Sequence, residues 1–270
     1  MLFIWLAAGV LTLLALFLFL IWPATRRHPD LVWVSGRYIA HRGLHSLDDA
    51  LPENSLAAFQ KAVEHGFMIE YDIHLTADGE VVVFHDDTAT RMCGMDRQIE
   101  DMTLAEIKEL RLAKSEETIP TLRECLDVVD GRVPLLIEFK CQHGNYRALC
   151  EKTNAILSDY NGPYVVQSFY PFAMQWYKKN RPDICRGQLS SAFKGEGLIR
   201  RAAGCLLFNV LSRPDFVSYD HRYAKHPCRR LCTLLGAYPF GWTFRSQEEV
   251  ETHRNEFKVY IFDHFLPEEK

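Results

Sequence analysis

Short apolar segments alternate with amphipathic ones along most of the chain, and this alternation constrains the fold more than any other feature. About eight of the apolar segments have the length of strands, and helical patterns follow most of them. Such alternation predicts a parallel sheet, because neighbouring parallel strands need a crossover connection between them. In a chain of 270 residues without internal repeats or low-complexity tracts, it is typical of one closed α/β barrel of the TIM (β/α)8 type.

The N-terminal segment differs from the rest of the chain. Residues 2–22 carry no charged side chain, and a helix of this length spans roughly 31 Å, about one hydrocarbon core. A signal peptide is the alternative, but a basic n-region and a small-residue cleavage site are not evident. We therefore predict one transmembrane helix over residues 1–24, a juxtamembrane linker over 25–36 and the barrel domain over 37–270.

Charge and cysteine usage indicate where the barrel domain resides. Arg26 and Arg27 directly follow the apolar segment, and no Lys or Arg precedes it, so the positive-inside bias predicts a single-pass protein with a cytoplasmic domain. The eight cysteines form no CxxC pair and are expected to be buried reduced thiols, which favours the same compartment. The net charge of -4 gives no reason to expect nucleic acid as a partner. The oligomeric state stays open.

Three acidic residues stand in apolar strand segments. Glu70 and Asp72 are two residues apart and therefore project to the same side of a strand, and Glu138 lies at the end of a second buried segment. Unpaired carboxylates against a core are costly, and three that converge repel one another unless a cation lies between them. Oxygen ligands suit Mg²⁺ or Ca²⁺ better than zinc. We therefore predict one divalent cation held by these three carboxylates.

Histidines and cations occur at the same expected rim of the barrel. His41 and His85 each lie just past a strand, at the same expected rim as Arg42 and Lys140. Two imidazoles of near-neutral pKa suit proton transfer to and from a phosphate ester. An arginine can grip phosphate oxygens with two hydrogen bonds, and a lysine can offset developing charge. A zinc enzyme that uses His41 and His85 as ligands remains an alternative.

These residues belong to a longer series of motifs. In chain order the series is His41-Arg42-Gly43, Pro52-Glu53-Asn54-Ser55, Ile69-Glu70-Tyr71-Asp72, Asp78-Gly79, His85-Asp86, Ile119-Pro120-Thr121-Leu122 and Glu138-x-Lys140. Each motif is weak alone, but all of them in order at these spacings are specific. The series resembles the glycerophosphodiester phosphodiesterases, in particular a membrane-anchored bacterial type, and the resemblance covers about residues 37–265.

The resemblance implies a fold, a reaction and a role for each residue. Members of this family are α/β barrels that use a divalent cation to hydrolyse glycerophosphodiesters to an alcohol and glycerol 3-phosphate. By resemblance the metal ligands are Glu70, Asp72 and Glu138, the acid–base pair is His41 and His85, the phosphate-binding residues are Arg42 and Lys140, and Trp242 is the late aromatic residue that packs against glycerol. The expected substrate is a small-molecule or lipid glycerophosphodiester.

Two departures from the family pattern concern the substrate. Phe244-Arg245 follows Trp242-Thr243 where the family has Val-Asn, and the last strand ends in a less typical Phe262-Asp263-His264. The predicted anchor would let the enzyme reach lysophospholipid head groups in the bilayer, so lysophospholipase D-like activity is an alternative. The motifs fit attack by the substrate's 2-hydroxyl, which leaves a cyclic phosphate, as well as attack by water. An alternative from another class is a catalytically silent, membrane-tethered phosphate-binding barrel.

Several other residues are expected to have structural roles. Glu53 is expected to orient Arg42 or its loop, and either Asn54 or Ser55 to cap a helix. His74 shares a strand face with two of the acids and is expected to form the wall of the site. The histidines expected to be solvated are His45, His143, His221 and His226.

Overall fold

A computed structural model describes residues 1–46, 50–142 and 144–268. It contains a sheet in the order β1-β9-β8-β7-β6-β5-β4-β2-β3, and β1 also pairs with β2, so that the sheet closes. The strands are β1 (Tyr38–His41), β2 (Met68–Leu75), β3 (Val81–Val83), β4 (Leu135–Phe139), β5 (Tyr164–Ser168), β6 (Arg186–Ser190), β7 (Phe216–Asp220), β8 (Tyr238–Phe244) and β9 (Val259–Phe262). Eight strands run parallel around the barrel, and β3 is antiparallel to β2. The predicted TIM-type barrel is confirmed.

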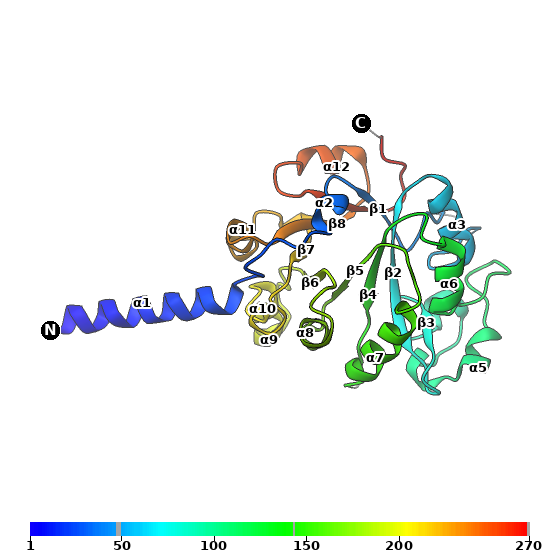
Figure 1. The fold of residues 1–270 in the computed structure, drawn as a ribbon, viewed down its shortest axis with the longest axis horizontal. Helices are drawn as coiled ribbons and strands as arrows, with labels where there is room; N and C mark the ends of the chain where they lie inside the picture. The colour runs from blue at the N-terminus through cyan, green and yellow to red at the C-terminus, as the bar shows by residue number, and fades with distance from the viewer. Residues whose placement is uncertain (47–49, 143, 269–270) are drawn as a thin grey trace.

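Helices connect and cover the strands (Figure 1). The α-helices are α1 (Leu2–Ile21), α2 (Leu31–Val34), α3 (Leu56–Glu64), α4 (Thr90–Cys93), α5 (Leu104–Lys108), α6 (Leu122–Val129), α7 (Tyr146–Leu157), α8 (Pro171–Asn180), α9 (Gly197–Gly204), α10 (Asn209–Ser212), α11 (Pro227–Leu234) and α12 (Gln247–Thr252), and the 3-10 helices are η1 (Ile99–Asp101) and η2 (His221–Tyr223). Local sequence sets several helix starts, because Thr103 and Thr121 each form a capping box with a glutamate three residues later.

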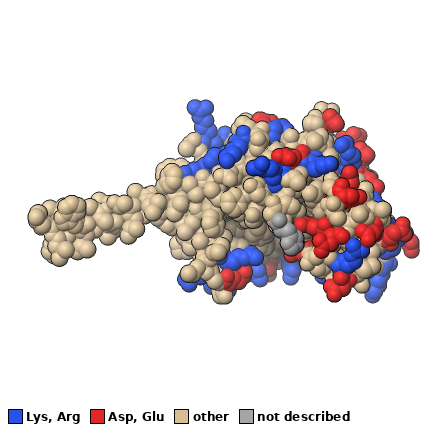
Figure 2. Space-filling model, turned by 90° about the horizontal axis from the view of Figure 1, so that it is seen from below, with Lys and Arg blue, Asp and Glu red and all other residues tan. Residues whose placement is uncertain are grey.

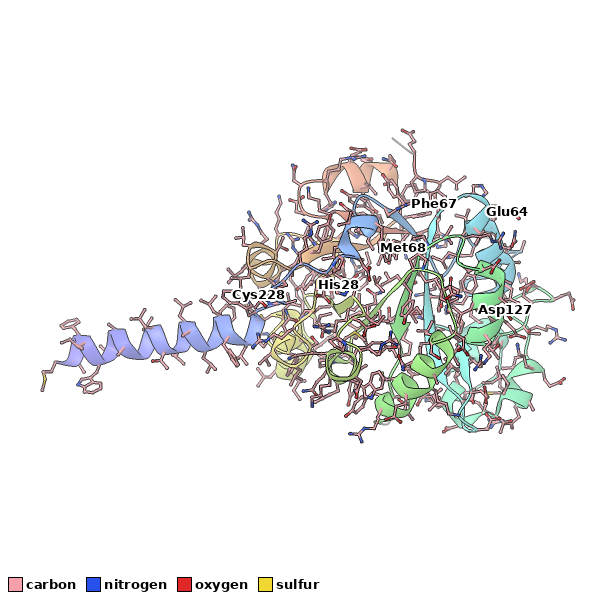
Figure 3. All side chains as sticks on the ribbon, viewed as in Figure 1. His28, Glu64, Phe67, Met68, Asp127 and Cys228 are labelled. Atoms are coloured by element: carbon pink, nitrogen blue, oxygen red, sulfur yellow. The ribbon has the colours of Figure 1, made fainter. Side chains whose placement is uncertain are left out.

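The N-terminal end of the barrel is filled by apolar side chains that alternate along the strands. Met68, at the start of β2, is labelled at this end in Figure 3. Phe216 stacks on Phe240 with 4.1 Å between ring centroids. Leu31 and Val34 of α2 are buried in the same cluster. The last part of the expected linker therefore packs against the barrel and closes this end.

Replacing Phe240 by alanine is expected to destabilise the barrel by about 3–5 kcal/mol, because it deletes a fully buried ring and leaves a cavity beside Phe216. The matched control is Leu234→Ala on α11, where the side chain is 83% exposed and the expected change stays within about 0.5 kcal/mol. Urea denaturation of the detergent-solubilised full chain measures both. Equal stability of the two variants would contradict this account of the core.

Helix α1 extends away from the barrel (Figure 1). It has 20 residues with a mean hydropathy of 2.7, and only Ile21 of the helix is buried. Its C-terminal end is attached to the segment around α10, because Asn209 Nδ2 donates to the Ile21 carbonyl at 3.0 Å and Arg213 Nη1 donates to the Trp22 carbonyl at 2.9 Å. The helix is long and apolar enough to cross a membrane.

Candidate functional site

The three predicted acidic residues meet where β1 and β4 end, beside the middle of the longer strand β2. Asp72 lies opposite Glu138 in the register of these strands, and Glu70 lies opposite His41 of β1. One carboxylate oxygen from each acid lies within 4.8 Å of the others, and all three side chains are buried. Strand register thus places three oxygen donors around one point, a donor set that suits a hard divalent cation.

The charges around this point are unequal. Burial, together with Asp72 and Glu138, raises the pKa of Glu70 well above its usual value, and burial likewise raises the pKa of Glu138. Burial also disfavours the Asp72 carboxylate, but Lys140, His85 and Arg42 outweigh it and hold the Asp72 pKa below its usual range. Acidic neighbours disfavour ionisation of a carboxyl group, and a bound cation would reverse that effect and stabilise the carboxylate. The residues present therefore fit a divalent metal.

Lys140 and Arg42 both contact Asp72. Lys140 Nζ lies 3.0 Å from Asp72 Oδ1 and 2.5 Å from Glu138 Oε1. Arg42 Nε lies 3.7 Å from Asp72 Oδ2, while its Nη1 donates to Glu53 Oε1 at 2.8 Å. Glu53 therefore orients Arg42, as the sequence indicated. Two cationic side chains thus border the carboxylates. These cations, and not the carboxylates, are the groups that suit an anionic ligand.

The backbone of the β1–α3 loop is shaped for this site. Arg42 has a φ of 56°, and its backbone N–H donates to Glu70 Oε2 at 3.1 Å. Asn54 has a φ of 55°, and its Nδ2 donates to Asp72 Oδ2 at 3.1 Å. Positive φ values are uncommon outside glycine and cluster at functional sites. Ser55 is the helix cap. Asn54, which the sequence offered as an alternative cap and as part of the Pro52–Ser55 motif, instead contacts an acid of the site.

His41 lies at the end of β1 beside the last strand. Its Nδ1 is 3.6 Å from Oδ2 of Asp263, which directly follows β9. Burial and the Arg42 charge lower the pKa of His41 from 6.5 to about 4, although Asp263 opposes them. Burial disfavours the Asp263 carboxylate, yet the adjacent His41 and His45 imidazoles hold its pKa below the usual value. The sequence did not indicate the contact of Asp263 with His41, although Phe262-Asp263-His264 stood out as a less typical end of the last strand.

His85 follows β3 and has its own carboxylate partner. Its Nδ1 lies 2.6 Å from Asp86 Oδ1, and Arg91 Nε donates to Asp86 Oδ2 at 2.6 Å. The adjacent residue therefore orients the ring, and an arginine holds that residue in turn. His41 lies opposite Glu70 in the register of β1 and β2, and Phe84, which precedes His85, donates its backbone N–H to the Asp72 carbonyl at 3.0 Å. The backbone therefore places both histidines beside the strand that carries two of the acids.

Trp242 lies in β8, opposite Asp220 of β7. Its ring is partly buried and meets the Phe169 ring edge-on, with 5.8 Å between the centroids. Phe169 directly follows β5, so this aromatic pair spans the rim between non-adjacent strands.

Two of the histidines expected to be solvated are shielded from solvent: His221 is buried, and the side chain of partly buried His45 is 7% exposed. His45 Nε2 lies 2.9 Å from Asp263 Oδ1, and His221 Nδ1 lies 3.2 Å from the Trp242 carbonyl. Those predictions are wrong, because loops over the barrel rim fold back onto the ends of β8 and β9. His226 is half-buried, and His143 lies outside the described residues. His74 is fully buried, with Nε2 3.4 Å from the His85 carbonyl, which agrees with a wall role.

Comparison with known proteins identifies the family. The model of the glycerophosphoryl diester phosphodiesterase family matches residues 41–205. A glycerophosphodiester phosphodiesterase of Caldanaerobacter subterraneus is 35% identical over 79% of this chain and 87% of its own length. The human lysophospholipase D GDPD1 is 29% identical over 53% of this chain and 49% of its own.

Solved structures share the fold. A glycerophosphodiester phosphodiesterase from Thermotoga maritima aligns with a TM-score of 0.65 at 26% identity, over 83% of this chain and 93% of that one. An Oleispira antarctica phosphodiesterase, solved with the product sn-glycerol 3-phosphate, aligns with a TM-score of 0.73 at 24% identity, over 87% of this chain and 95% of that one. With the family match and the 35% identical relative, the chain belongs to the glycerophosphoryl diester phosphodiesterase family of enzymes.

Proposed function

We propose that this protein is a membrane-anchored, metal-dependent phosphodiesterase that hydrolyses glycerophosphodiesters to an alcohol and glycerol 3-phosphate. The observation that carries the proposal is the convergence of Glu70, Asp72 and Glu138 at one rim, bordered by two cations, with two histidines beside the same strand. The 35% identical relative, itself a glycerophosphodiester phosphodiesterase, supports the substrate class.

Glu70, Asp72 and Glu138 would hold one divalent cation, Mg²⁺ or Ca²⁺, through carboxylate oxygens. A bound cation would supply Lewis-acid polarisation of the phosphate and charge neutralisation. Zinc bound by His41 and His85 is less well supported, because neither histidine belongs to a group of three or more converging metal-ligand side chains among the described residues. The metal content of the purified protein separates the two possibilities.

His41 and His85 carry out the proton transfers in this proposal. His41 is uncharged at neutral pH, since burial lowers its pKa to about 4, and it can accept a proton from the attacking oxygen. His85, whose Nδ1 is held by Asp86, donates a proton to the leaving oxygen. Arg42, fixed by Glu53, binds phosphate oxygens, and Lys140 offsets the negative charge that develops on them.

Residues 1–24 anchor the enzyme in this proposal, and residues 37–270 form the barrel domain. The length and hydropathy of α1 support the anchor, and Arg26 and Arg27 after it favour a cytoplasmic barrel. A C-terminal green fluorescent protein fusion is therefore expected to fluoresce in bacteria, and an alkaline phosphatase fusion to be inactive. The reverse pattern would place the barrel on the other side of the membrane.

The proposal is tested by assaying the purified full chain on glycerophosphocholine, glycerophosphoethanolamine and lysophospholipids, with Mg²⁺ or Ca²⁺ added after chelation. We expect release of the alcohol and of glycerol 3-phosphate, loss of activity with chelator and recovery with one of the cations. A cyclic phosphate among the products would indicate attack by the 2-hydroxyl. No turnover of any substrate with either cation would instead support a silent phosphate-binding barrel.

Replacing Asp263 by asparagine is expected to lower kcat at least about tenfold with little change in KM, because Asp263 positions His41 and does not itself bind phosphate. The carboxylate charge raises the pKa of His41, so its removal should shift that pKa further below about 4. NMR titration of the imidazole measures the shift. Unchanged kcat together with an unchanged His41 titration would show that Asp263 has no such role.

A further inference from the structure

A second set of ligand side chains converges where the barrel closes, outside the three-carboxylate site. His45 lies in the loop between β1 and α3, and Asp263 and His264 directly follow β9, the strand that pairs with β1. One ligand atom from each of these residues, here called the two-histidine group, lies within 4.8 Å of the others. Two imidazole nitrogens and one carboxylate suit Zn²⁺ and its first-row neighbours, whereas the all-oxygen site suits Mg²⁺ or Ca²⁺.

The distances within the two-histidine group approach those of a tetrahedral metal site. His45 Nε2 lies 2.9 Å from Asp263 Oδ1, and His264 Nε2 lies 3.3 Å from Asp263 Oδ2. The two rings are nearly perpendicular, with 5.0 Å between centroids and 81° between planes. Ligand atoms held about 2.0–2.2 Å from one zinc ion lie roughly 3.3–3.6 Å from each other. Small side-chain adjustments would therefore place one atom of each residue around a single ion.

A network of hydrogen bonds is the alternative explanation for this group. His45 Nε2 and Asp263 Oδ1 are both buried, and only 2.9 Å separates them. Neither atom forms an aligned hydrogen bond, with the other or with any further side chain or backbone group in the described part of the chain. Buried polar atoms are normally hydrogen-bonded, so two that face each other without a bond require an explanation. A cation shared between them supplies it.

The backbone and a neighbouring cavity favour a bound ion at this place. His264 has a φ of 62°, an uncommon value outside glycine, and at this turn its ring lies beside that of His45. A cavity of about 220 Å³ is lined by the two-histidine group and by Lys61 of α3. Three protein ligands leave the fourth position of a zinc ion open. The cavity has room there for water or, near the Lys61 ammonium, for a small anion.

Asp263 connects the two-histidine group to the proposed proton-transfer pair. Its Oδ2 lies 3.6 Å from His41 Nδ1, and the same carboxylate contacts His45 and His264. A metal ion that took this carboxylate as a ligand would compete with His41 for it. Removal of the Asp263 charge is expected to lower kcat at least about tenfold, so the ion should have an effect of similar size.

We propose that His45, Asp263 and His264 bind one first-row transition-metal ion such as Zn²⁺, and that the bound ion slows turnover by competing with His41 for Asp263. The binding site follows from the geometry of the group, whereas the effect on turnover rests on the proposed function. Mg²⁺ and Ca²⁺ prefer oxygen ligands and are expected to stay at the three acids. The two sites thus select different metals.

Isothermal titration with Zn²⁺ tests the site without turnover. The full chain in phosphatidylcholine nanodiscs is titrated in saturating Mg²⁺, which fills the three-carboxylate site. Mg²⁺ also occupies exposed carboxylates, and acidic side chains are numerous on the part of the barrel away from α1 (Figure 2). We expect one tight zinc site in the unaltered protein, and binding at least about tenfold weaker in His264→Gln and in His45→Gln, because each variant loses a ligand.

His65→Gln is the matched control for the titration, since it removes an exposed imidazole outside the two-histidine group. Its zinc affinity should equal that of the unaltered protein. The partly exposed His264 keeps the test valid if His45→Gln fails to fold. Equal zinc affinity in all four proteins would overturn the site, because the ion would then be bound by thiols, by surface acids or by the three-carboxylate site.

Turnover of glycerophosphocholine in saturating Mg²⁺ tests the effect on His41. Zn²⁺ is expected to lower kcat about tenfold in the unaltered protein and in His65→Gln, and to change that of His264→Gln by less than about twofold. Inhibition of equal size in His264→Gln would show that zinc acts elsewhere, and it would overturn the effect through Asp263. Normal kcat with zinc bound would overturn that effect as well.

These measurements separate the proposal from the function on which its second part rests. Absence of turnover with every substrate and cation would overturn the proposed function together with the effect of zinc on it, while the titration still decides whether the two-histidine group binds the ion. Zinc in the purified protein is assigned to this group if His264→Gln lacks it, so the metal content of the two proteins is compared.

Discussion

The Asp72→Asn variant is expected to lose at least about a thousandfold in kcat/KM. Asp72 is the most connected acid of the site, because Asn54 donates to it and both Lys140 and Arg42 lie beside it. Its pKa is held below the usual range by those cations, so it is the carboxylate most firmly charged. Removing that charge removes a metal ligand, and a bound metal contributes several kcal/mol to transition-state stabilisation, where about 4 kcal/mol corresponds to a thousandfold.

The change is nearly isosteric, so the barrel is expected to stay folded. The control is Glu80→Gln, an exposed carboxylate in the β2–β3 turn, which should keep full activity. Isothermal titration with Mg²⁺ and Ca²⁺ gives a readout independent of turnover, and binding by Asp72→Asn should be strongly weakened. Glu70→Gln and Glu138→Gln are expected to act in the same direction. A variant at Asp72 that kept a tenth of the activity and normal cation affinity would be incompatible with the three-carboxylate site.

His41→Gln and His85→Gln are each expected to lower kcat by about 10²- to 10⁴-fold, the usual contribution of one general acid or base. The two losses should differ in their dependence on the leaving group. The nitrophenolate of a nitrophenyl phosphodiester leaves without needing a proton. Such a substrate should therefore largely restore turnover by His85→Gln, which lacks the proposed proton donor, and should not restore turnover by His41→Gln.

His65→Gln is the matched control for the histidine variants, since His65 is an exposed residue at the end of α3. Its activity should equal that of the unaltered protein. Rescue of His41→Gln in place of His85→Gln would exchange the two roles. Normal turnover by both variants on every ester would remove the imidazoles from the mechanism.

The barrel and the main acids were predictable because they depend on local patterns. Alternation along the chain indicates parallel strands, and the two-residue spacing of Glu70 and Asp72 places both on one face. Parallel register then brings Glu138 opposite Asp72, a contact between neighbouring strands. The capping boxes of α5 and α6 are likewise local.

The missed residues depend on contacts that a linear pattern does not encode. Asp263 reaches His41 because barrel closure places β9 beside β1, the last strand beside the first. Asn54 fits a helix cap equally well in sequence, and its bond to Asp72 follows from the loop backbone at positive φ. The break between α9 and α10 likewise depends on the backbone, because Leu206 between these helices has a φ of 60°.

The most direct test of the central claim is an anomalous difference map from crystals of the full chain grown with Ca²⁺. Our account predicts a peak between Glu70, Asp72 and Glu138, with oxygen ligands at about 2.3–2.6 Å. A second group of side chains that offers three converging ligand atoms, His45, Asp263 and His264, lies among the described residues. A peak bound there, with none between the three acids, would contradict the proposed site.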